Sequence, residues 1–573
     1  MPSKPATGNP ASAQELNLNA VVPLQYFRSA HSGLTQAEME LAVNQAIVML
    51  DDLYAHLLLK EAMHAVNPVQ ALKLLLLQVR RGVITDEKTF HQRMLDIFIS
   101  LRDLHTNYLL PEPFAGSVAF LPFMVDEYFD ENGFPHYPVT RVMAGSVQPP
   151  FVPGVEITHW NGMPMEEAIA LNANDHAGSN AAARHLQGLL TMTSRPLASS
   201  LPPREDWVTL TYVHSGGVNE IRFPWSVFRP QRAALSVQAD NPADPAATAM
   251  GIDIGLATAH RARKLLFKPA SIRREVQMMS QGAAASMQQT QSISEDVLRN
   301  FTVFPNEIEY GLKNTRSGKF GILRLRSFDV SDYMAYVNEI VRILQVLPQE
   351  GLILDVRGNP GGNILSGEHL LQLFTERPIE PEPVCLRNTT GTLAFAKHES
   401  LKKWAPSIDL AVETGAHYSQ YFPLSDPSSV NSFGRRYPGK VVLLTDASCY
   451  STTDFFAAGF QDHEIGPVIG YDQATGAGGA NVWTHGLLQQ FLPPQNGSAN
   501  GKPSPLEALP RGMSMRISFR RSTRVGARAG LPLEDLGVQC DRLHRKTRRD
   551  VFEDAADLYE TAGKTLLEMI QSA

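Results

Sequence analysis

The sequence predicts a multidomain α/β protein, and three patterns along the chain support this fold class. Residues 35–104 carry apolar side chains at helical spacing, which indicates a small helical bundle. Residues 116–230 are rich in strand-forming segments. From Phe320 onward strands alternate with helices, a pattern typical of crossover units and a largely parallel sheet. The 573 residues suffice for about three or four domains, each with its own core.

The chain divides into five expected parts. Residues 1–33 are rich in Pro, Ala and Asn and are expected to form a flexible arm. The helical bundle takes residues 34–115, and a β-rich module takes 116–231. Residues 232–300 are small and polar and predict a long mobile insertion, with a plain solvated linker as the alternative. Residues 301–573 form the α/β core with its C-terminal helix.

Individual elements follow from local patterns. In the module, Gly154–Pro164 predicts a hairpin with an Asn-Gly turn, Glu166–Asn172 a helix, and Trp207–His214 a strand. In the core the predicted strands are 320–328, 351–356, 441–444, 467–470 and 513–519, and the predicted helices are 330–347, 451–462 and 550–570.

The composition excludes several classes of function. The chain is 43% hydrophobic and 19% charged with a net charge of −7, so we expect neither nucleic acid nor an anionic membrane as partner. Its three cysteines lie far apart and argue against a structural zinc site. The N-terminal residues contain no apolar signal region, and no apolar run is long enough to span a bilayer. We therefore expect a cytoplasmic protein, without a metal or another cofactor, while export by another route stays open.

Ser451 lies at a junction of strand, turn and helix. There its hydroxyl is close to free backbone N–H groups and to the positive end of the helix dipole. That environment suits a nucleophile whose attack generates an oxyanion. The alternative is structural, because Ser451 and Asp454 also have the spacing of a capping box. Ser448 and Cys449 are nearby alternative nucleophiles.

His105 lies where the bundle gives way to an extended apolar segment. Its neighbours Asp103 and Thr106 suit a catalytic base, although a structural role is the alternative.

Glycines follow the buried strand 351–356, at the sheet edge where functional groups collect. Acyl transfer needs a hydroxyl, a base, an orienting carboxylate and N–H donors. The spacing of these residues does not by itself show that they meet.

Four segments resemble the tail-specific, or C-terminal processing, serine peptidases. Asp355–Gly362 resembles the D-x-R-x-N-x-G-G signature of that family, and Ser451–Asp462 is similar to its nucleophile segment. Asp103–Thr106 resembles D-x-H-[ST], and Leu533–Val538 resembles I-E-x-x-G-V, in the branch with a histidine base. That branch includes the tricorn core peptidase and the chlamydial protease-like factor.

The resemblance implies a mechanism and residue roles. It implies a serine endopeptidase that acts through an acyl-enzyme on Ser451, with His105 as general base and Glu534 as orienting carboxylate. The oxyanion hole would use the backbone N–H of Thr452 and that of Gly361 or Gly362. Protein or peptide substrates are the expected partners, and a homodimer is one candidate assembly.

The resemblance also implies the architecture. The core would be a Clp/crotonase-like spiral αβ domain, and the module 116–231 would be PDZ-like and help to capture substrate chain ends. The insertion 232–300 would be an occluding or cleavable activation segment. Two other functions stay open, namely a non-catalytic relative that binds peptides or other ligands, and an acyl-thioester hydrolase on the same fold.

Other members of the family use a serine–lysine dyad, with the lysine in a G-K-G turn. The corresponding turn here holds Ala477, and no lysine lies between Ser451 and Lys502, so such a dyad is excluded. His463 and His485 are rival bases that match no catalytic segment of the family.

Arginines concentrate between residues 516 and 549 in an otherwise acidic protein. We expect ion pairs on a solvated face, with the binding of acidic substrate segments as the alternative.

Overall fold

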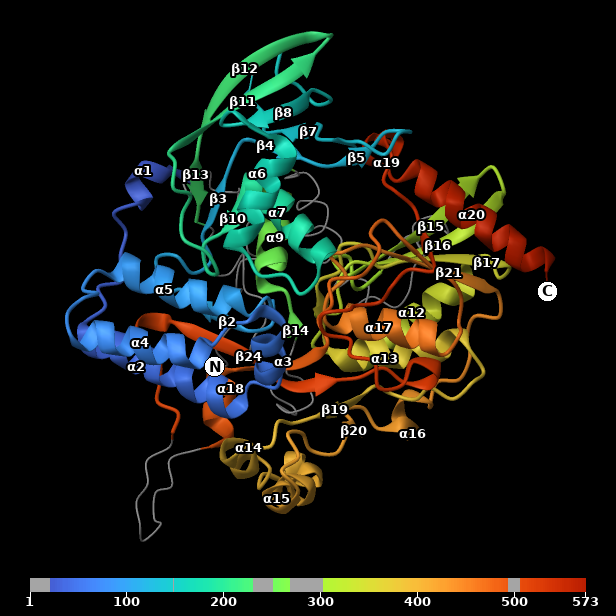
Figure 1. The fold of residues 1–573 in the computed structure, drawn as a ribbon. Coiled ribbons are helices and arrows are strands. Elements are labelled where there is room, and N and C mark those ends of the chain that lie inside the picture. The colour runs from blue at the N-terminus through green and yellow to red at the C-terminus, as the bar shows by residue number, and fades with distance from the viewer. Residues whose placement is uncertain (1–20, 148, 230–250, 268–301, 493–504, 573) are drawn as a thin grey trace, which may run out of the picture.

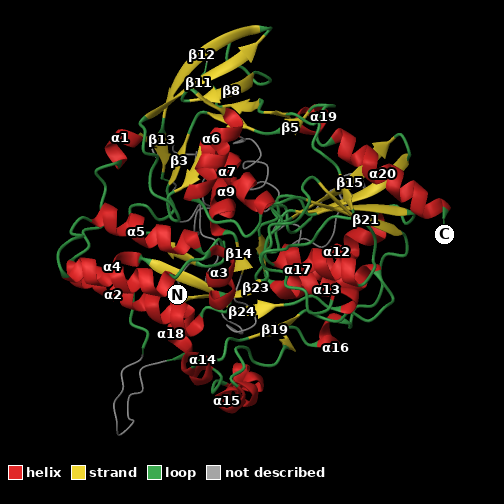
Figure 2. Cartoon of the chain, in the orientation of Figure 1, coloured by secondary structure: helices red, strands yellow, loops and turns green. Residues whose placement is uncertain are grey.

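The computed structural model describes residues 21–147, 149–229, 251–267, 302–492 and 505–572 (Figure 1). The N-terminal helices lie on one side, the β-rich module extends at the top of the view, and the α/β core lies on the opposite side (Figures 1 and 2). None of the described helices is both long and apolar enough to cross a bilayer.

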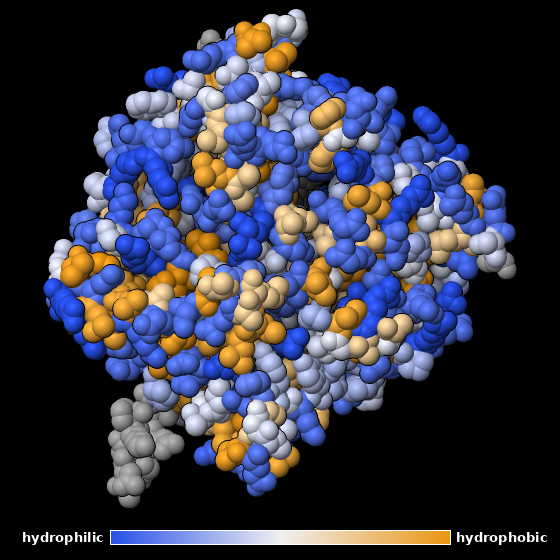
Figure 3. All heavy atoms as spheres, viewed as in Figure 1, coloured by the Kyte–Doolittle hydropathy of each residue, from blue (hydrophilic) through white to orange (hydrophobic). Residues whose placement is uncertain are grey.

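The predicted bundle is present. It comprises α2 (Gln36–Val48), α3 (Leu57–His64), α4 (Pro68–Arg80) and α5 (Glu87–Ser100). Thr35 caps α2 in a capping box with Glu38, and Asn67 caps α4. Apolar residues at a spacing of three and four, such as those of α4, point into one continuous core. Other apolar side chains gather on the outer surface over these helices (Figure 3), among them Met63, Leu74 and Leu77.

Part of the expected flexible arm is ordered. Residues 1–20 lie outside the described part of the chain, but β1 (Val21–Pro23) pairs antiparallel with β13 (Ser226–Phe228). The following short helix, α1 (Leu24–Phe27), buries Leu24 and Phe27. The prediction for residues 21–27 is therefore wrong, because these two apolar side chains anchor the segment on the module.

The β-rich module contains the predicted hairpin, helix and strand. Its sheet has the order β12 (Gly217–Pro224), β11 (Trp207–His214), β8 (Glu156–Trp160) and β9 (Met163–Pro164). β8 and β9 meet through Asn161 and Gly162, which both have positive φ, as an Asn-Gly turn requires. The helix α6 (Met165–Asn172) follows β9 directly, and α7 (Ala181–Thr193) packs against it.

The core sheet confirms the predicted alternation of strands and helices. Its order is β15 (Ile308–Thr315), β16 (Gly318–Leu325), β17 (Gly351–Asp355), β21 (Lys440–Thr445), β22 (Val468–Gly470) and β25 (Arg542–Leu543). All pairs from β16 to β25 are parallel. The helices α12 (Tyr333–Val346), α13 (Ile364–Leu371) and α17 (Thr452–Asp462) share one apolar cluster with the sheet, whereas α20 (Ala556–Gln571) forms a second cluster with it.

A second sheet joins the bundle to the core. Its central strand β24 (Ser514–Ser522) pairs with β2 (Asn107–Leu109), β19 (Pro383–Cys385) and β23 (Ala480–Thr484). β2 begins two residues after His105. This pairing carries the candidate base from the N-terminal bundle toward the C-terminal half of the molecule.

Two other segments differ from expectation. The predicted helix 550–570 is broken into α19 (Arg548–Phe552) and α20, because Asp554 and Ala555 adopt left-handed φ values of 53° and 57°. Within the predicted insertion the structure describes residues 251–267, which form β14 (Gly251–Ile252) and α9 (Ile254–Phe267). Residues 232–250 and 268–300 lie outside the described part.

The remaining elements are short. They are β3 (Val118–Phe120), β4 (Phe123–Val125), β5 (Tyr128–Phe129), β6 (Pro135–His136), β7 (Val139–Val142), β10 (Ser194–Pro196), β18 (Gly361–Gly362), β20 (Phe422–Pro423), α14 (Thr390–Phe395), α15 (Ala405–Thr414), α16 (Pro427–Val430) and α18 (His485–Phe491).

Candidate active site

Ser451 is fully buried at the turn between β21 and α17. Its backbone has φ 61° and ψ −120°, a conformation that costs a non-glycine residue about 1–3 kcal/mol and is concentrated at functional sites. Its hydroxyl makes no capping hydrogen bond, and its Oγ has no partner among the described residues. The capping alternative is therefore wrong. A buried hydroxyl without a partner is what a nucleophile awaiting its base and substrate presents.

Asp454 holds a neighbouring loop against Ser451. Its Oδ1 accepts the N–H of Ala477 at 3.1 Å, and its Oδ2 accepts the N–H of Gly478 at 2.8 Å. Gly478 has to be glycine, because a Cβ there would lie 2.7 Å from the Ser451 nitrogen. The loop that would carry the lysine of a dyad thus packs on the serine with a buried alanine, Ala477, in the lysine position.

His105 is fully buried beside the nucleophile segment. The centroid of its ring lies 4.5 Å from that of Tyr450, the residue before Ser451. Neither ring nitrogen has a hydrogen-bond partner in the described chain. Burial lowers the pKa of His105 to about 3, although the Asp103 carboxylate acts in the opposite direction. The imidazole is therefore neutral near pH 7, the form that accepts a proton.

Asp103 fixes the backbone around His105. Its Oδ1 accepts the His105 N–H at 2.8 Å, and its Oδ2 accepts hydroxyls of Tyr54, Thr106 and Ser518 at 2.8–2.9 Å. Burial would raise the pKa of this carboxyl, but His56 and the Lys60 ammonium lower it well below its usual value. Asp103 is thus a charged anchor that connects the end of the bundle to β24.

Glu534 lies in the same buried region but is bonded to other groups. Its Oε1 accepts Lys60 Nζ at 2.9 Å and Ser179 Oγ at 3.0 Å, and its Oε2 accepts the Gly479 N–H at 3.2 Å. None of these bonds involves the His105 ring. Burial raises the pKa of the Glu534 carboxyl, and the charge of Lys60 opposes that shift. Burial lowers the pKa of the Lys60 ammonium, but its acidic neighbours outweigh this effect and keep the ammonium charged. The expected histidine–carboxylate contact is not formed in this conformation.

No local sequence pattern points to several members of this network. Lys60 looks like an ordinary polar residue in α3, but it is fully buried and also bonds Asp535. Tyr450 and Ser179 were missed as well, although the position of Tyr450 directly before the candidate nucleophile was a usable hint. Among the described residues, His56, Asp103 and Glu534 bring ligand atoms within 4.8 Å of one another. Lys60 already occupies the position beside Glu534, and its ammonium is bonded to that carboxylate.

The glycine loop after β17 lies beside the start of α17. Asp355 and Arg357 form a buried bidentate pair with N–O distances of 2.9 and 2.6 Å, which fixes the base of the loop. Thr452 Oγ1 donates to the Gly362 carbonyl at 2.7 Å. Gly362 has φ 145°, and a Cβ there would lie 2.1 Å from the Phe328 backbone. Gly361 donates its N–H to Asn359 Oδ1 at 3.0 Å.

Part of the insertion covers these glycines. β14 pairs antiparallel with β18, with Gly251 opposite Gly362 and Ile252 opposite Gly361. The Asp253 N–H continues this pairing by donating to the Pro360 carbonyl at 3.2 Å. An extended segment of the protein's own chain therefore lies along two of the three candidate oxyanion residues.

The rival residues are placed elsewhere or are unsuited to the chemistry. His463 lies at the far end of α17, where its ring nitrogens bond Gly459 and Glu380. His485 bonds Gln45 in the bundle. Cys449 is buried, donates its thiol to the Val356 carbonyl and has a raised pKa because of that burial, so it is a poor nucleophile. Ser448 precedes the strained position, and its N–H is bonded to Asp446.

The fold and the site together define a serine-type hydrolase: a strained, buried serine at the carboxyl edge of a parallel sheet, with a neutral histidine and a glycine loop close by. Residues 319–490 match peptidase family S41. Over this segment, which is less than half of the 573 residues, the sequence is similar to that family, and the match supports a serine-type peptidase of the tail-specific kind. The resemblance noted in the sequence is thereby confirmed.

Two solved structures of one protein, mature CPAF, show the same fold over most of the chain. The crystal structure of mature CPAF is 17% identical, with 94% of this chain and 98% of that chain covered and a TM-score of 0.61. Mature CPAF complexed with lactacystin gives 17% identity, coverages of 94% and 99% and a TM-score of 0.60. The photosystem II D1 C-terminal processing protease is 12% identical, with coverages of 93% and 100% and a TM-score of 0.39. No curated protein matches the sequence.

Proposed function

We propose that this protein is an endopeptidase with Ser451 as nucleophile, His105 as general base and Glu534 as the orienting carboxylate. The observation that carries the proposal is the strained, unbonded Ser451 directly after Tyr450, whose ring centroid lies 4.5 Å from that of the buried neutral His105. Ser451 Oγ attacks the scissile carbonyl and transfers its proton to His105, which then donates it to the leaving amine. A water molecule, deprotonated by His105, hydrolyses the acyl-enzyme and regenerates the serine.

The oxyanion is stabilised by backbone N–H groups at the start of α17 and in the glycine loop. The donors are the N–H of Thr452 and that of Gly361 or Gly362. In the described form the Gly361 N–H is bonded to Asn359, and Gly362 is paired with Gly251. Loss of one such donor reduces transition-state stabilisation by roughly 3 kcal/mol.

The described conformation is that of a latent form. β14 lies along the glycine loop, and Glu534 is held by Lys60 instead of His105. In this proposal residues 232–300 act as the activation segment, and their withdrawal opens the glycines to substrate. Activation in this proposal also includes the release of Glu534 from Lys60, so that its carboxylate can contact the imidazole.

The finer architecture and setting are proposals as well. The core is a Clp/crotonase-like spiral domain, which the order of its parallel strands supports. The module 116–231 is PDZ-like and captures substrate chain ends, for which its four-stranded sheet with α6 is the support. A cytoplasmic location and a homodimer complete the proposal; cell fractionation and analytical ultracentrifugation test them.

Fluorophosphonate labelling tests the nucleophile. We expect labelling of the wild type that is lost in Ser451→Ala and strongly reduced in His105→Ala, but is retained in Ser448→Ala and His463→Ala. Hydrolysis of casein and of an acyl-thioester, measured side by side, separates a peptidase from a thioester hydrolase. Labelling that persists in Ser451→Ala refutes the assignment.

Self-processing tests the activation segment. Wild type and Ser451→Ala are incubated in parallel and their fragments are identified by mass spectrometry. We expect cleavage between residues 232 and 300 in the wild type only. A wild-type protein that is active on casein with this segment intact contradicts the latent-form proposal.

A further inference from the structure

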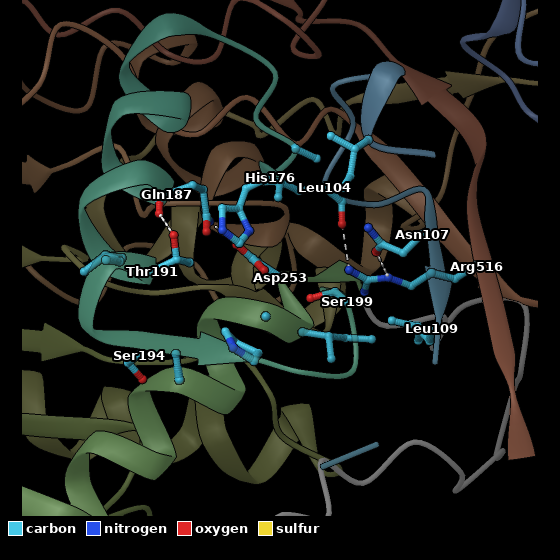
Figure 4. A pocket seen from close by; sticks show the side chains of 17 residues that line it. Leu104, Asn107, Leu109, His176, Gln187, Thr191, Ser194, Ser199, Asp253 and Arg516 are labelled. Atoms are coloured by element: carbon cyan, nitrogen blue, oxygen red, sulfur yellow. Dashed lines mark hydrogen bonds between the residues drawn. The ribbon is translucent and has the colours of Figure 1, made fainter. Parts of the chain in front are cut away.

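A buried cavity, lined by apolar and polar side chains, lies beside the segment that covers the glycine loop. Figure 4 shows its walls, which come from the turn after the bundle, α7, β24 and the start of α9. The polar side chains that the cavity brings together are Asn107, His176, Gln187, Thr191, Ser194, Ser199, Asp253 and Arg516. The peptidase mechanism proposed above uses none of them.

Asp253 extends from the covering segment into this cavity. Its carboxylate accepts Gln187 Nε2 at 2.8 Å, and the residue is only 3% exposed. Asp253 directly follows Ile252, which pairs with Gly361, and its own N–H donates to the Pro360 carbonyl. The acidic side chain is thus held at a fixed position relative to the candidate oxyanion residues.

Arg516 supplies the opposite charge. It is 2% exposed on β24, and its guanidinium donates to Asn107 Oδ1 and to the Leu104 carbonyl, each at 2.7 Å. Burial lowers the pKa of Arg516, and Asp253 is the charged neighbour that opposes this most. These two acceptors are neutral, whereas the carboxylates of Asp253 and, less strongly, Asp103 favour the charged guanidinium. A buried guanidinium without an anion is strongly unfavourable.

An extended peptide that pairs with a strand edge is recognised in two ways. Main-chain hydrogen bonds bind it without regard to sequence, and pockets that receive its side chains provide specificity. β14 pairs with β18 in this manner, and the side chain of the next residue enters the cavity. If a substrate takes the place of this segment, Arg516 and Gln187 face the substrate side chain at that position.

We propose that the cavity is a specificity subsite for an acidic substrate side chain, recognised by Arg516 and Gln187, and that Asp253 fills it in the described form. The inference rests on the proposed peptidase function and adds a substrate class to it, namely peptides with Asp or Glu close to the scissile bond. A charge-assisted hydrogen bond in a buried site discriminates by about 10- to 100-fold.

The first test uses the wild-type protein after self-processing and the synthetic peptide of residues 251–258. Inhibition of casein hydrolysis is compared with that by the same peptide carrying Asn in place of Asp253. We expect the aspartate peptide to inhibit about 10- to 100-fold more tightly. Equal inhibition by the two peptides overturns the subsite. This comparison needs no mutant protein to fold.

The second test uses peptide substrates in which the residue at each position around the cleaved bond is Asp, Glu, Asn or Ala. We expect one position at which the acidic residues raise kcat/KM by about 10- to 100-fold in the wild type. Arg516→Lys and Gln187→Leu reduce that preference. Arg520→Lys is the matched control, because Arg520 lies on the same strand, is 1% exposed and bonds Asn481 outside the cavity.

The outcomes separate the two proposals. Hydrolysis without any acidic preference refutes the subsite and leaves the peptidase intact. An acidic preference that Arg516→Lys, Gln187→Leu and Arg520→Lys all retain also refutes it, because recognition then occurs elsewhere. Absence of both hydrolysis and fluorophosphonate labelling refutes the peptidase and the subsite together.

Discussion

Replacement of Lys60 by Met tests whether the buried ion pair with Glu534 stabilises the latent form. Lys60 is 0% and Glu534 2% exposed, and Nζ lies 2.9 Å from Oε1. Without the ammonium, Glu534 keeps only the neutral donors Ser179 and Gly479. Removal of one partner of a buried pair costs about 3–5 kcal/mol, because the other charge stays buried and unpaired. We therefore expect Lys60→Met to lower the free energy of unfolding by about that amount.

The size of the effect is best isolated by a double-mutant cycle. Glu534→Gln alone leaves Lys60 paired with Asp535, so we expect it to cost less than Lys60→Met. The double variant Lys60→Met/Glu534→Gln has no buried unpaired charge at position 534. Its loss of unfolding free energy should be about 1–3 kcal/mol smaller than the sum of the losses of the two single variants.

Guanidinium denaturation followed by tryptophan fluorescence measures these differences. All variants carry Ser451→Ala, so that self-cleavage does not interfere. Lys402→Met is the matched control, because its pair with Glu399 is 65% and 80% exposed, and no measurable change is expected there. The reasoning is refuted if Lys60→Met unfolds at the same denaturant concentration as Lys402→Met. Additivity of the two single changes within about 0.5 kcal/mol would show that the two residues do not interact.

Two further predictions concern the glycine loop and the base. Gly362→Ala should abolish fluorophosphonate labelling, because the added Cβ would lie 2.1 Å from the Phe328 backbone. Gly486→Ala is the control and should label normally, since the space around Gly486 is open. Equal labelling of the two variants would contradict the tight packing at Gly362. Burial lowers the pKa of His105 from 6.5 to about 3, so the unfolded chain binds more protons in this range and the protein loses stability as the pH falls. In the Ser451→Ala background, His105→Gln should make that loss shallower by about 1.4 kcal/mol per pH unit between roughly pH 5 and 4; an unchanged slope of unfolding free energy against pH would contradict it.

Local patterns in the sequence predicted much of the fold. β17, β21 and α17 appear where the apolar runs place them, and the hairpin forms at its Asn-Gly turn. These elements are decided by hydrophobic periodicity and turn chemistry within a few residues. The break between α19 and α20 was not predicted, because two ordinary residues, Asp554 and Ala555, adopt left-handed φ there.

The candidate site was predictable only in part. The motifs located Ser451, His105 and the glycines, but they could not reveal that Lys60 holds Glu534, since the two residues are 474 positions apart. The pairing of β14 with the glycine loop likewise depends on long-range placement. Arg516 was expected in a solvated basic region and instead lies buried against Asn107, which also far precedes it in sequence. No local pattern carries such contacts.

The pairing of β2 with β24 has a consequence for when activity can arise. It joins Asn107 to Arg516 and Tyr108 to Met515, and so it positions His105 only after β24 has been synthesised. The residue expected to orient the base, Glu534, follows later still. A chain emerging from the ribosome therefore exposes its nucleophile segment well before its base is anchored. A truncated product that ends before β24 therefore lacks the strand on which the position of His105 depends.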